Sequence, residues 1–251
     1  MSVVVFTQAR SDSTRLPGKV LKQVLGRTML EFHIRRVAQI THAHQHVVVT
    51  STESNDDVIC QHVKSLQVTV MRGSKRNVLE RFVNAAKEME LSDGDHIVRL
   101  TGDCPLVDPK LVDELIQLHL GSGADYSNID VGTIPRGFDA EVFKVAKLFE
   151  VFQAATEDFE QEHVTPYFYQ HPELFQCQSL SFSPPIAPHL RLCVDEARDF
   201  EVFEHVVKHF GRDIDLVSAT EIVDYLNCNP EVAELNAAVA QKKLQEDAGE
   251  D

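Results

Sequence analysis

Short runs of β-branched and other apolar residues recur along the first hundred positions of the chain. They lie at 3–6, 46–52, 68–71 and 96–100. Runs of this length without polar alternation are typical of strands buried on both faces of a sheet. Between them, apolar residues recur at helical spacing, as at Leu30, Ile34 and Val37. Strands that alternate with amphipathic helices predict an α/β fold with a doubly wound, mostly parallel sheet.

The pattern changes in the second half of the chain. Asp108 and Pro109 are a favourable cap and first residue for one more helix. From about 124 to 190 the sequence is strand-like and rich in turns, with one helical patch near 145–155, which we interpret as a strand-rich insertion on the same sheet. A short strand and a helix are expected at "RLCVDEARDF". We therefore expect a single domain over 1–244 and a disordered acidic tail at 245–251.

Composition narrows the classes of partner. The 251 residues carry a formal net charge of -15, which repels nucleic acid and anionic membranes, so neither is expected as a partner. No apolar run approaches the roughly 18 residues of a membrane span, and the first residues do not resemble a signal peptide, so a cytoplasmic location is expected. The five dispersed cysteines form no CxxC pair and indicate neither a disulfide framework nor a zinc site.

Positive charge is concentrated near the start of the chain. Residues 1–40 contain seven lysines and arginines against two acidic residues. Arg10, Arg15 and Lys19 lie among glycine and hydroxyl residues in the segment 7–27, which follows the first predicted strand. In open α/β sheets ligands bind at the carboxyl ends of strands, and such cations suit a polyphosphate. A solvated basic loop is the alternative.

Two aspartates follow later predicted strands. Asp103 comes after the strand at 96–100, and Asp195 precedes the helix of "RLCVDEARDF". Two carboxylates directed at one cleft can hold Mg²⁺, which takes one or two carboxylates together with phosphate oxygens and waters. The alternatives are a turn aspartate and a helix N-cap. The DxD at 93–95 precedes a strand and is interpreted as a turn.

Several blocks together resemble the cytidylyltransferase family, in its spore coat polysaccharide biosynthesis protein F branch. The blocks are "ARSDSTRLPGKVL", "GS..NVLERF", "VRLTGDCPLVDP", "YSN....IPRGFDAEVF", "EHVTPY" and "RLCVDEARDFE". The family includes the enzymes that make CMP-Kdo and CMP-sialic acids. The resemblance implies a nucleotide-diphospho-sugar transferase fold and a reaction in which CTP and an acceptor give a CMP-activated acceptor and pyrophosphate. It also implies a homodimer and a role in surface glycan synthesis.

The resemblance also implies roles for individual residues. The catalytic set is Arg10, Arg15, Lys19 and Asp103. Nucleotide binding is expected at Ala9, Arg10, Arg15, Lys19, Gly73, Ser74 and Asp103. Asp103 and Asp195 are the expected Mg²⁺ ligands. A small sugar-type acceptor, an acidic sugar or a related molecule, is expected near Arg136, Asp139 and Glu141.

One block departs from the family pattern. Lys75, Arg76 and Asn77 stand where acidic residues are usual, which favours either a more acidic acceptor or cations that face solvent. Three alternatives to a cytidylyltransferase are another NTP as donor, a sugar-nucleotide-dependent glycosyltransferase, and a non-catalytic nucleotide-binding relative. The retained cations and aspartates argue against the last of these.

Overall fold

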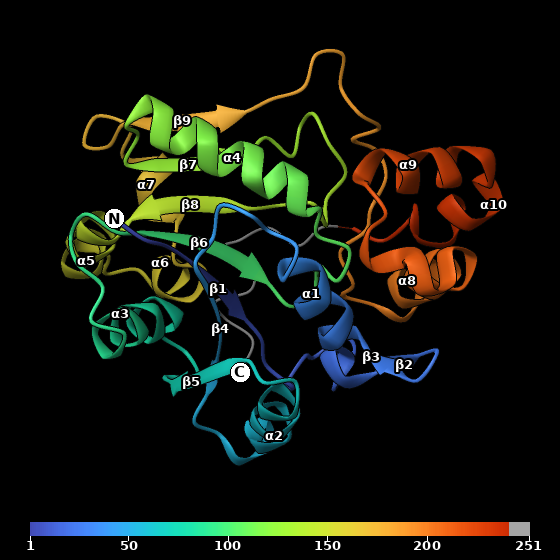
Figure 1. Ribbon diagram of the computed structural model, residues 1–251, viewed down its shortest axis with the longest axis horizontal. Helices are drawn as coiled ribbons and strands as arrows, with labels where there is room; N and C mark the ends of the chain where they lie inside the picture. The colour runs from blue at the N-terminus through green and yellow to red at the C-terminus, as the bar shows by residue number, and fades with distance from the viewer. Residues whose placement is uncertain (241–251) are drawn as a thin grey trace.

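Seven strands form one central sheet, and helices cover both of its faces (Figure 1). The computed structural model describes residues 1–240, so the acidic tail expected at 245–251 lies outside the described residues. The strands of the sheet are β1 (Val3–Gln8), β4 (Gln45–Ser51), β5 (Thr69–Gly73), β6 (His96–Thr101), β7 (Tyr126–Ile129), β8 (Glu141–Lys144) and β9 (Cys177–Leu180). The predicted α/β class is confirmed.

The order of strands in the sheet is β5-β4-β1-β6-β8-β7-β9. Strands β5, β4, β1 and β6 are parallel neighbours, which confirms the first four predicted strands. Strand β8 runs antiparallel to both β6 and β7, whereas β7 and β9 are parallel. The segment predicted as an insertion thus adds its three strands to the same sheet.

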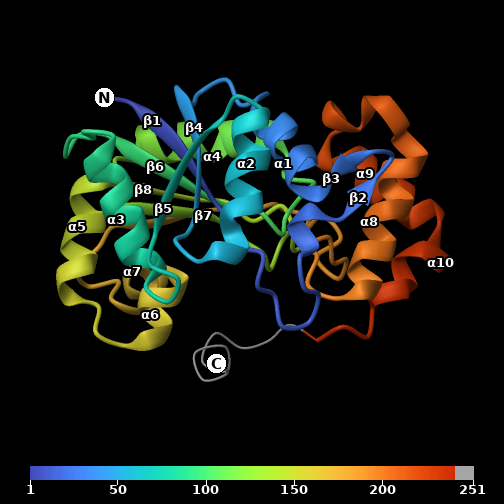
Figure 2. The same cartoon turned by 90° about the horizontal axis from the view of Figure 1, so that it is seen from below.

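The two faces of the sheet bury different helices (Figure 2). One face packs against α1, α2 and α4, and the other packs against α3, α5 and α7. The helices are α1 (Met29–Val37), α2 (Asp57–Ser65), α3 (Val78–Glu88), α4 (Pro109–Ser122), α5 (Val145–Ala154), α6 (Asp158–His163), α7 (Pro166–Gln170), α8 (Ala197–Phe210), α9 (Ala219–Cys228) and α10 (Pro230–Ala233). None of the described helices is long and apolar enough to span a membrane.

The C-terminal helices α8, α9 and α10 gather at one side of the molecule, beside a small hairpin (Figure 1). That hairpin, β2 (Gln23–Val24) with β3 (Arg27–Thr28), belongs to the long segment after β1. Short 3-10 turns complete the structure: η1 (Lys19–Leu21), η2 (Ser54–Asp56), η3 (Gly211–Asp215) and η4 (Glu234–Asn236).

Local capping explains where several helices begin. The Asp108 carboxylate accepts hydrogen bonds from the backbone N–H groups of Lys110 and Leu111 (2.8 and 3.4 Å), and Pro109 occupies the first turn of α4, as predicted. Such a cap satisfies backbone donors that have no partner within the helix. The side chains of Thr28 and Asn77 accept from the third residues of α1 and α3 in the same way.

The chain changes direction across the sheet between β1 and β6. Strands β4 and β5 follow on one side of β1, and β6 lies on its other side. Ligands in open α/β sheets bind at such a switch point, outside the carboxyl ends of the strands. Gly102 lets the two strand ends approach closely, because a Cβ there would lie 3.2 Å from the Ala9 Cβ and 3.3 Å from the Gln8 carbonyl oxygen.

The prediction of a short strand before Asp195 is wrong. Arg191 forms only an isolated bridge with Arg136. The amide of Leu192 donates to the Arg136 carbonyl (2.7 Å), and that of Val194 donates to the Asp103 carbonyl (2.8 Å). Because these two amides donate to two different loops, the segment forms no continuous ladder of strand hydrogen bonds with either of them. The segment instead joins the loop before β8 to the loop after β6.

Candidate active site

Lys19 lies between the two predicted metal ligands. Its Nζ is 3.1 Å from Asp103 Oδ2 and 2.8 Å from Asp195 Oδ1. Asp103 follows β6 and Asp195 precedes α8, so three segments far apart in the sequence meet at one ammonium group. Gly18, with φ of +67°, takes the left-handed turn that opens η1 and directs the next residue inward.

The cation and the carboxylates in this group reinforce one another. Burial disfavours the charged form of Lys19, but Asp103 and Asp195 outweigh it and raise the Lys19 pKa above its usual value. Burial likewise pushes the pKa of Asp103 upward, but the charge of Lys19 and the hydroxyl of Thr101 hold that pKa below its usual range. Lys19 and Asp103 therefore stay ionised across the physiological pH range.

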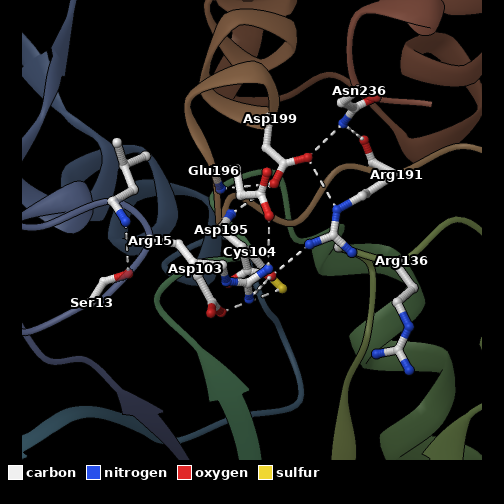
Figure 3. Close-up of polar contacts among 12 residues, drawn as sticks. Ser13, Arg15, Asp103, Cys104, Arg136, Arg191, Asp195, Glu196, Asp199 and Asn236 are labelled. Carbon is white, nitrogen blue, oxygen red and sulfur yellow. Dashed lines mark hydrogen bonds and ion pairs between the residues drawn. The ribbon is translucent and has the colours of Figure 1, made fainter. Parts of the chain in front are cut away.

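Two arginines approach Asp195 from opposite sides of the site (Figure 3). Arg15 Nη2 is 3.3 Å from Asp195 Oδ2, and Arg15 Nη1 is 3.3 Å from Glu196 Oε1. Arg191 Nη2 donates to Asp195 Oδ2 at 2.6 Å. Together with Lys19, they surround Asp195 with three cations. Arg191 was not among the residues predicted from the sequence, although it lies in the same block, four positions before Asp195.

Arg10 does not join this group of charges. Its Nη2 lies 3.5 Å from Glu162 Oε1 on α6, and its side chain is 45% exposed. The loop after β1 thus places Lys19 and Arg15 at the aspartates and Arg10 towards the insertion. Ala9 is buried, and its amide donates to the Val49 carbonyl at 3.1 Å, so it anchors the start of the loop.

Gly73 and Ser74 form the end of β5 and the turn after it. A Cβ at Gly73 would lie 2.9 Å from Arg81 Cγ, which explains the glycine. Arg81 donates to the Ser74 carbonyl from Nε and Nη2 (2.9 and 2.6 Å). These bonds fix the turn at the carboxyl edge of the sheet, where β4 separates β5 from β1.

The basic block after Ser74 has structural partners. Lys75 Nζ lies 2.5 Å from Asp12 Oδ2, an ion pair that ties this turn to the loop after β1. The Asn77 side chain caps α3 and also donates to Gln161 Oε1 at 3.1 Å. The sequence predicts that this block either favours an acidic acceptor or faces solvent. It does not indicate these contacts within the protein.

The predicted acceptor residues fall into two groups. Arg136 Nη1 lies 3.2 Å from Asp139 Oδ2 in the loop before β8. Burial raises the pKa of Asp139, and the carboxylates of Glu141 and Asp103 act in the same direction. This loop packs against the segment of Asp195 so closely that a Cβ at Gly137 would lie 2.5 Å from the Leu192 carbonyl carbon.

Glu141 lies on β8 and is already well supplied with donors. Its carboxylate accepts from Arg99 Nη1, from the Tyr126 hydroxyl at 2.6 Å and from the Thr165 hydroxyl at 2.7 Å. A carboxylate bound by three donors has little capacity left for a ligand. The structure therefore pairs Arg136 with Asp139 and makes Glu141 the hub of another network, whose charge also acts on Asp139.

A chain of buried and partly buried hydrogen bonds supports the turn that carries Asp103. His33 Nδ1 lies 2.9 Å from the Cys104 carbonyl, and its Nε2 lies 2.9 Å from Thr7 Oγ1, which in turn is 2.9 Å from His46 Nε2. A carbonyl only accepts, so Nδ1 of His33 carries the proton and the Thr7 hydroxyl donates to Nε2. Burial lowers the pKa of His33 to about 4, in keeping with this neutral ring.

The donor set fits a hard divalent cation. Asp103 and Asp195 both point at the position that the Lys19 ammonium occupies, so the site already stabilises positive charge. Within residues 1–240 no group of three or more His, Cys, Asp or Glu side chains forms a cluster able to hold a metal. Two carboxylates are a ligand set that Mg²⁺ commonly takes, with phosphate oxygens and waters as its other ligands.

Comparison with known proteins decides the family. The family model described as cytidylyltransferase matches residues 4–244. The chain belongs to the cytidylyltransferase family. It is a nucleotidyltransferase, and the resemblance found in its motifs is confirmed.

Two relatives agree with this membership. Spore coat polysaccharide biosynthesis protein SpsF of Bacillus subtilis (strain 168) is 38% identical over 237 residues, which cover 92% of this chain and 96% of that protein. A cytidylyltransferase structure from Leptospira borgpetersenii serovar Hardjo-bovis (strain JB197) has a TM-score of 0.87 at 29% identity, covering 97% of this chain and 99% of the other.

A more distant structure shares the fold. The structure of CMP:2-keto-3-deoxy-manno-octonic acid synthetase complexed with CTP has a TM-score of 0.64 at 14% identity, covering 83% of this chain and 99% of the other. The predicted fold type is thereby confirmed.

Proposed function

We propose that this cytidylyltransferase transfers CMP from CTP to a sugar-type acceptor, releases pyrophosphate and depends on Mg²⁺. The observation that carries the proposal is the convergence of Lys19 and Arg15 with Asp103 and Asp195 at the switch point of the sheet. Cations for a triphosphate and carboxylates for its metal thus lie within one group of contacts. The name of the Bacillus relative supports a role in polysaccharide synthesis for this chain.

Nucleotide binding would exchange the partners of these cations. Lys19 and Arg15 now neutralise carboxylates, and the oxygens of a triphosphate would take over that role. Asp103 and Asp195 would then hold Mg²⁺, which supplies charge neutralisation at the phosphate oxygens when bound. The guanidinium of Arg15 can bind two phosphate oxygens at once, whereas Lys19 acts as a compact charge. Ala9, Arg10, Gly73 and Ser74 complete the proposed nucleotide site.

The proposed reaction at the α-phosphorus requires no covalent bond to the protein. An acceptor hydroxyl or phosphate oxygen attacks in line with the departing pyrophosphate, so positioning and charge supply most of the acceleration. Arg10, Arg15 and Lys19 stabilise the charge that grows on pyrophosphate. Arg136 and Asp139 orient the acceptor, and Arg136 provides the cation that an acidic sugar requires. Glu141 acts in this site through the network around Arg99 and Tyr126.

The insertion also supports the proposed homodimer. Tyr169 and Leu174, which lie in the segment 124–190, are 42% and 57% exposed. These exposed apolar side chains are available for a contact with a second copy. Light scattering on the purified protein tests this, and a monomeric mass at working concentrations would contradict it.

Replacement of Asp103 tests the central assignment. We expect Asp103→Asn to lower the rate of CTP-dependent pyrophosphate release by at least about 100-fold, because a carboxylate ligand and charge are lost. Asp93→Asn is the matched control, because Asp93 belongs to the turn that resembles a DxD and is exposed. Circular dichroism checks that both variants fold.

One outcome and two assays separate the alternatives. Full activity of Asp103→Asn together with loss in Asp93→Asn would transfer the metal site to the DxD. Thermal shift with the four NTPs and several sugar nucleotides identifies the donor. A panel of acidic sugars, sugar phosphates and phosphonates, assayed by pyrophosphate release with Mg²⁺ and CTP, identifies the acceptor.

A further inference from the structure

A continuous set of side-chain hydrogen bonds connects Asp195 to the last turn of the described chain (Figure 3). Arg191 forms its centre, with Nη2 2.6 Å from Asp195 Oδ2 and Nε 3.1 Å from Asp199 Oδ1. Asn236 of η4 then donates from Nδ2 to Asp199 Oδ1 at 2.8 Å and to the Arg191 carbonyl at 3.0 Å. We call Arg191, Asp199 and Asn236 the C-terminal latch.

The two oxygens of Asp199 have separate partners. Oδ2 accepts from the backbone amides of Asp195 and Glu196, each at 3.0 Å, and the bond from Glu196 belongs to the capping box at the start of α8. Oδ1 accepts from Arg191 and Asn236, and a helix cap does not require either contact. The second set of contacts therefore orients Arg191 instead of starting the helix.

Burial makes the hydrogen bonds of the C-terminal latch costly to break. Asp199 is 2% exposed and Asn236 is 3% exposed. A buried carboxylate without its donors is costly, so the carboxylate, guanidinium and amide stay together as a unit. Because Asn236 also binds the Arg191 carbonyl, it restrains both the main chain and, through Asp199, the side chain of that arginine.

The need for such a unit follows from the proposed nucleotide site. Of the three cations around Asp195, Arg15 and Lys19 belong to the loop that turns to the triphosphate. Arg191 is the one that comes from the segment of Asp195 itself and is tied to the C-terminal turns. When the other two change partners, Arg191 is left to hold the carboxylate in place.

We infer that the C-terminal latch positions Asp195 for the metal–nucleotide complex, with Asn236 as a positioning residue contributed by the last turn. This inference rests on the proposed function and adds to it a part of the chain to which the sequence motifs assigned no role. The latch sets the orientation of a ligand without touching CTP. Its loss therefore affects metal binding and turnover more than nucleotide affinity at saturating metal.

Asn236→Ala tests the inference with a metal-binding readout. We expect the affinity for Mn²⁺ in the presence of CTP, measured by electron paramagnetic resonance without acceptor, to fall about 10- to 100-fold. We expect kcat to fall while KM for CTP at saturating Mg²⁺ stays within about twofold, since Arg15 and Lys19 are retained. Asn229→Ala is the matched control, because its Nδ2 donates to the Tyr225 carbonyl at 2.7 Å, within the same C-terminal region but away from the latch.

A second variant guards against a general loss of folding. Arg191→Lys keeps the charge but removes the fork that reaches both Asp195 and Asp199, so it is expected to reproduce the loss of Mn²⁺ affinity. Thermal unfolding of the metal-free proteins shows how much of each effect is stability alone. Wild-type Mn²⁺ affinity in Arg191→Lys, or equal losses in Asn236→Ala and Asn229→Ala, overturns the latch. Failure of the wild-type protein to bind Mn²⁺ with CTP overturns the proposed function and the latch with it.

Discussion

Lys19 has two roles at the scale of single residues. In the structure it neutralises Asp103 and Asp195, and in the proposed reaction it binds the triphosphate. Without its ammonium, Asp103 and Asp195 would lose the cation that lies between them, which destabilises the fold. The same side chain therefore supports stability before binding and catalysis after it.

Lys19→Met separates these roles. We expect the thermal midpoint measured without metal to fall, and added Mg²⁺ to raise it more in the variant than in the wild type, because the variant's carboxylates have lost their internal cation. We also expect kcat/KM for CTP to fall about 100-fold. Lys22→Met is the control, since Lys22 is exposed, with its Nζ 5.3 Å from the Phe200 ring centroid. Equal Mg²⁺ increments in all three proteins would argue against a shared cation position.

At the scale of elements, local patterns predicted the regular part of the fold. The four parallel strands and the caps at Asp108 and Pro109 followed from residues adjacent in the chain. The helices α6 and α7 were missed because they are only six and five residues long. Helix α9 was also missed, although Ser218 and Glu221 form a capping box at its start, which is a signal that the sequence carries. The antiparallel direction of β8 could not be predicted either, because the alternation of apolar and polar residues along a strand is the same in both directions.

The candidate site was predictable only in part, for the same reason. Strand ends and motif blocks pointed to Lys19, Asp103 and Asp195, but the ion pairs that join them span 84 and 176 positions. No local signal shows that Arg10 turns to Glu162 or that Asn236 reaches Asp199. Those contacts depend on how loops pack, which the spacing of apolar residues does not encode.

Gly137 and Gly18 provide a test of loop packing. Gly137→Ala is expected to lower stability by at least about 2 kcal/mol, because its Cβ would collide with backbone of the Asp195 segment at a φ of +109°. Gly18→Ala also has a positive φ but meets no atom within 4 Å, so only about 1 kcal/mol of strain is expected. Urea unfolding of both variants measures the difference. A Gly137→Ala protein no less stable than Gly18→Ala would contradict the close packing of the two loops.

At the scale of the whole molecule, three histidines are buried between strands and helices, and a fourth, His46, is half-buried. His33 and His46 meet at Thr7, and His96 Nδ1 lies 3.0 Å from His119 Nε2. Burial lowers the pKa of His119 to about 3, and its neighbour His96 acts in the same direction. A histidine whose pKa is lower in the folded state stabilises the fold above its unfolded pKa of about 6.5, and this stability is lost as the pH falls.

The stability of the protein should therefore decline in mild acid. For His119 alone, the loss between pH 7 and pH 5 is about 2 kcal/mol. Measured by urea unfolding, the slope of the unfolding free energy against pH should be shallower in His119→Gln by up to about one proton. Carboxylates with lowered pKa values titrate below this window, so they do not mask the effect. An unchanged slope would show that His119 is not neutral in the folded protein.

Asn236 lies 133 positions after Asp103, so the two residues leave the ribosome at different times during synthesis of the chain. A ribosome adds roughly 5–20 residues per second, so Asp103 emerges on the order of ten seconds before the residue that completes the contacts behind Asp195. The sheet can form during that interval, whereas the full set of contacts around Asp195 cannot. A growing chain would thus carry a folded core before Asp195 is held in place, and the proposed metal site would be completed only once Asn236 has been added.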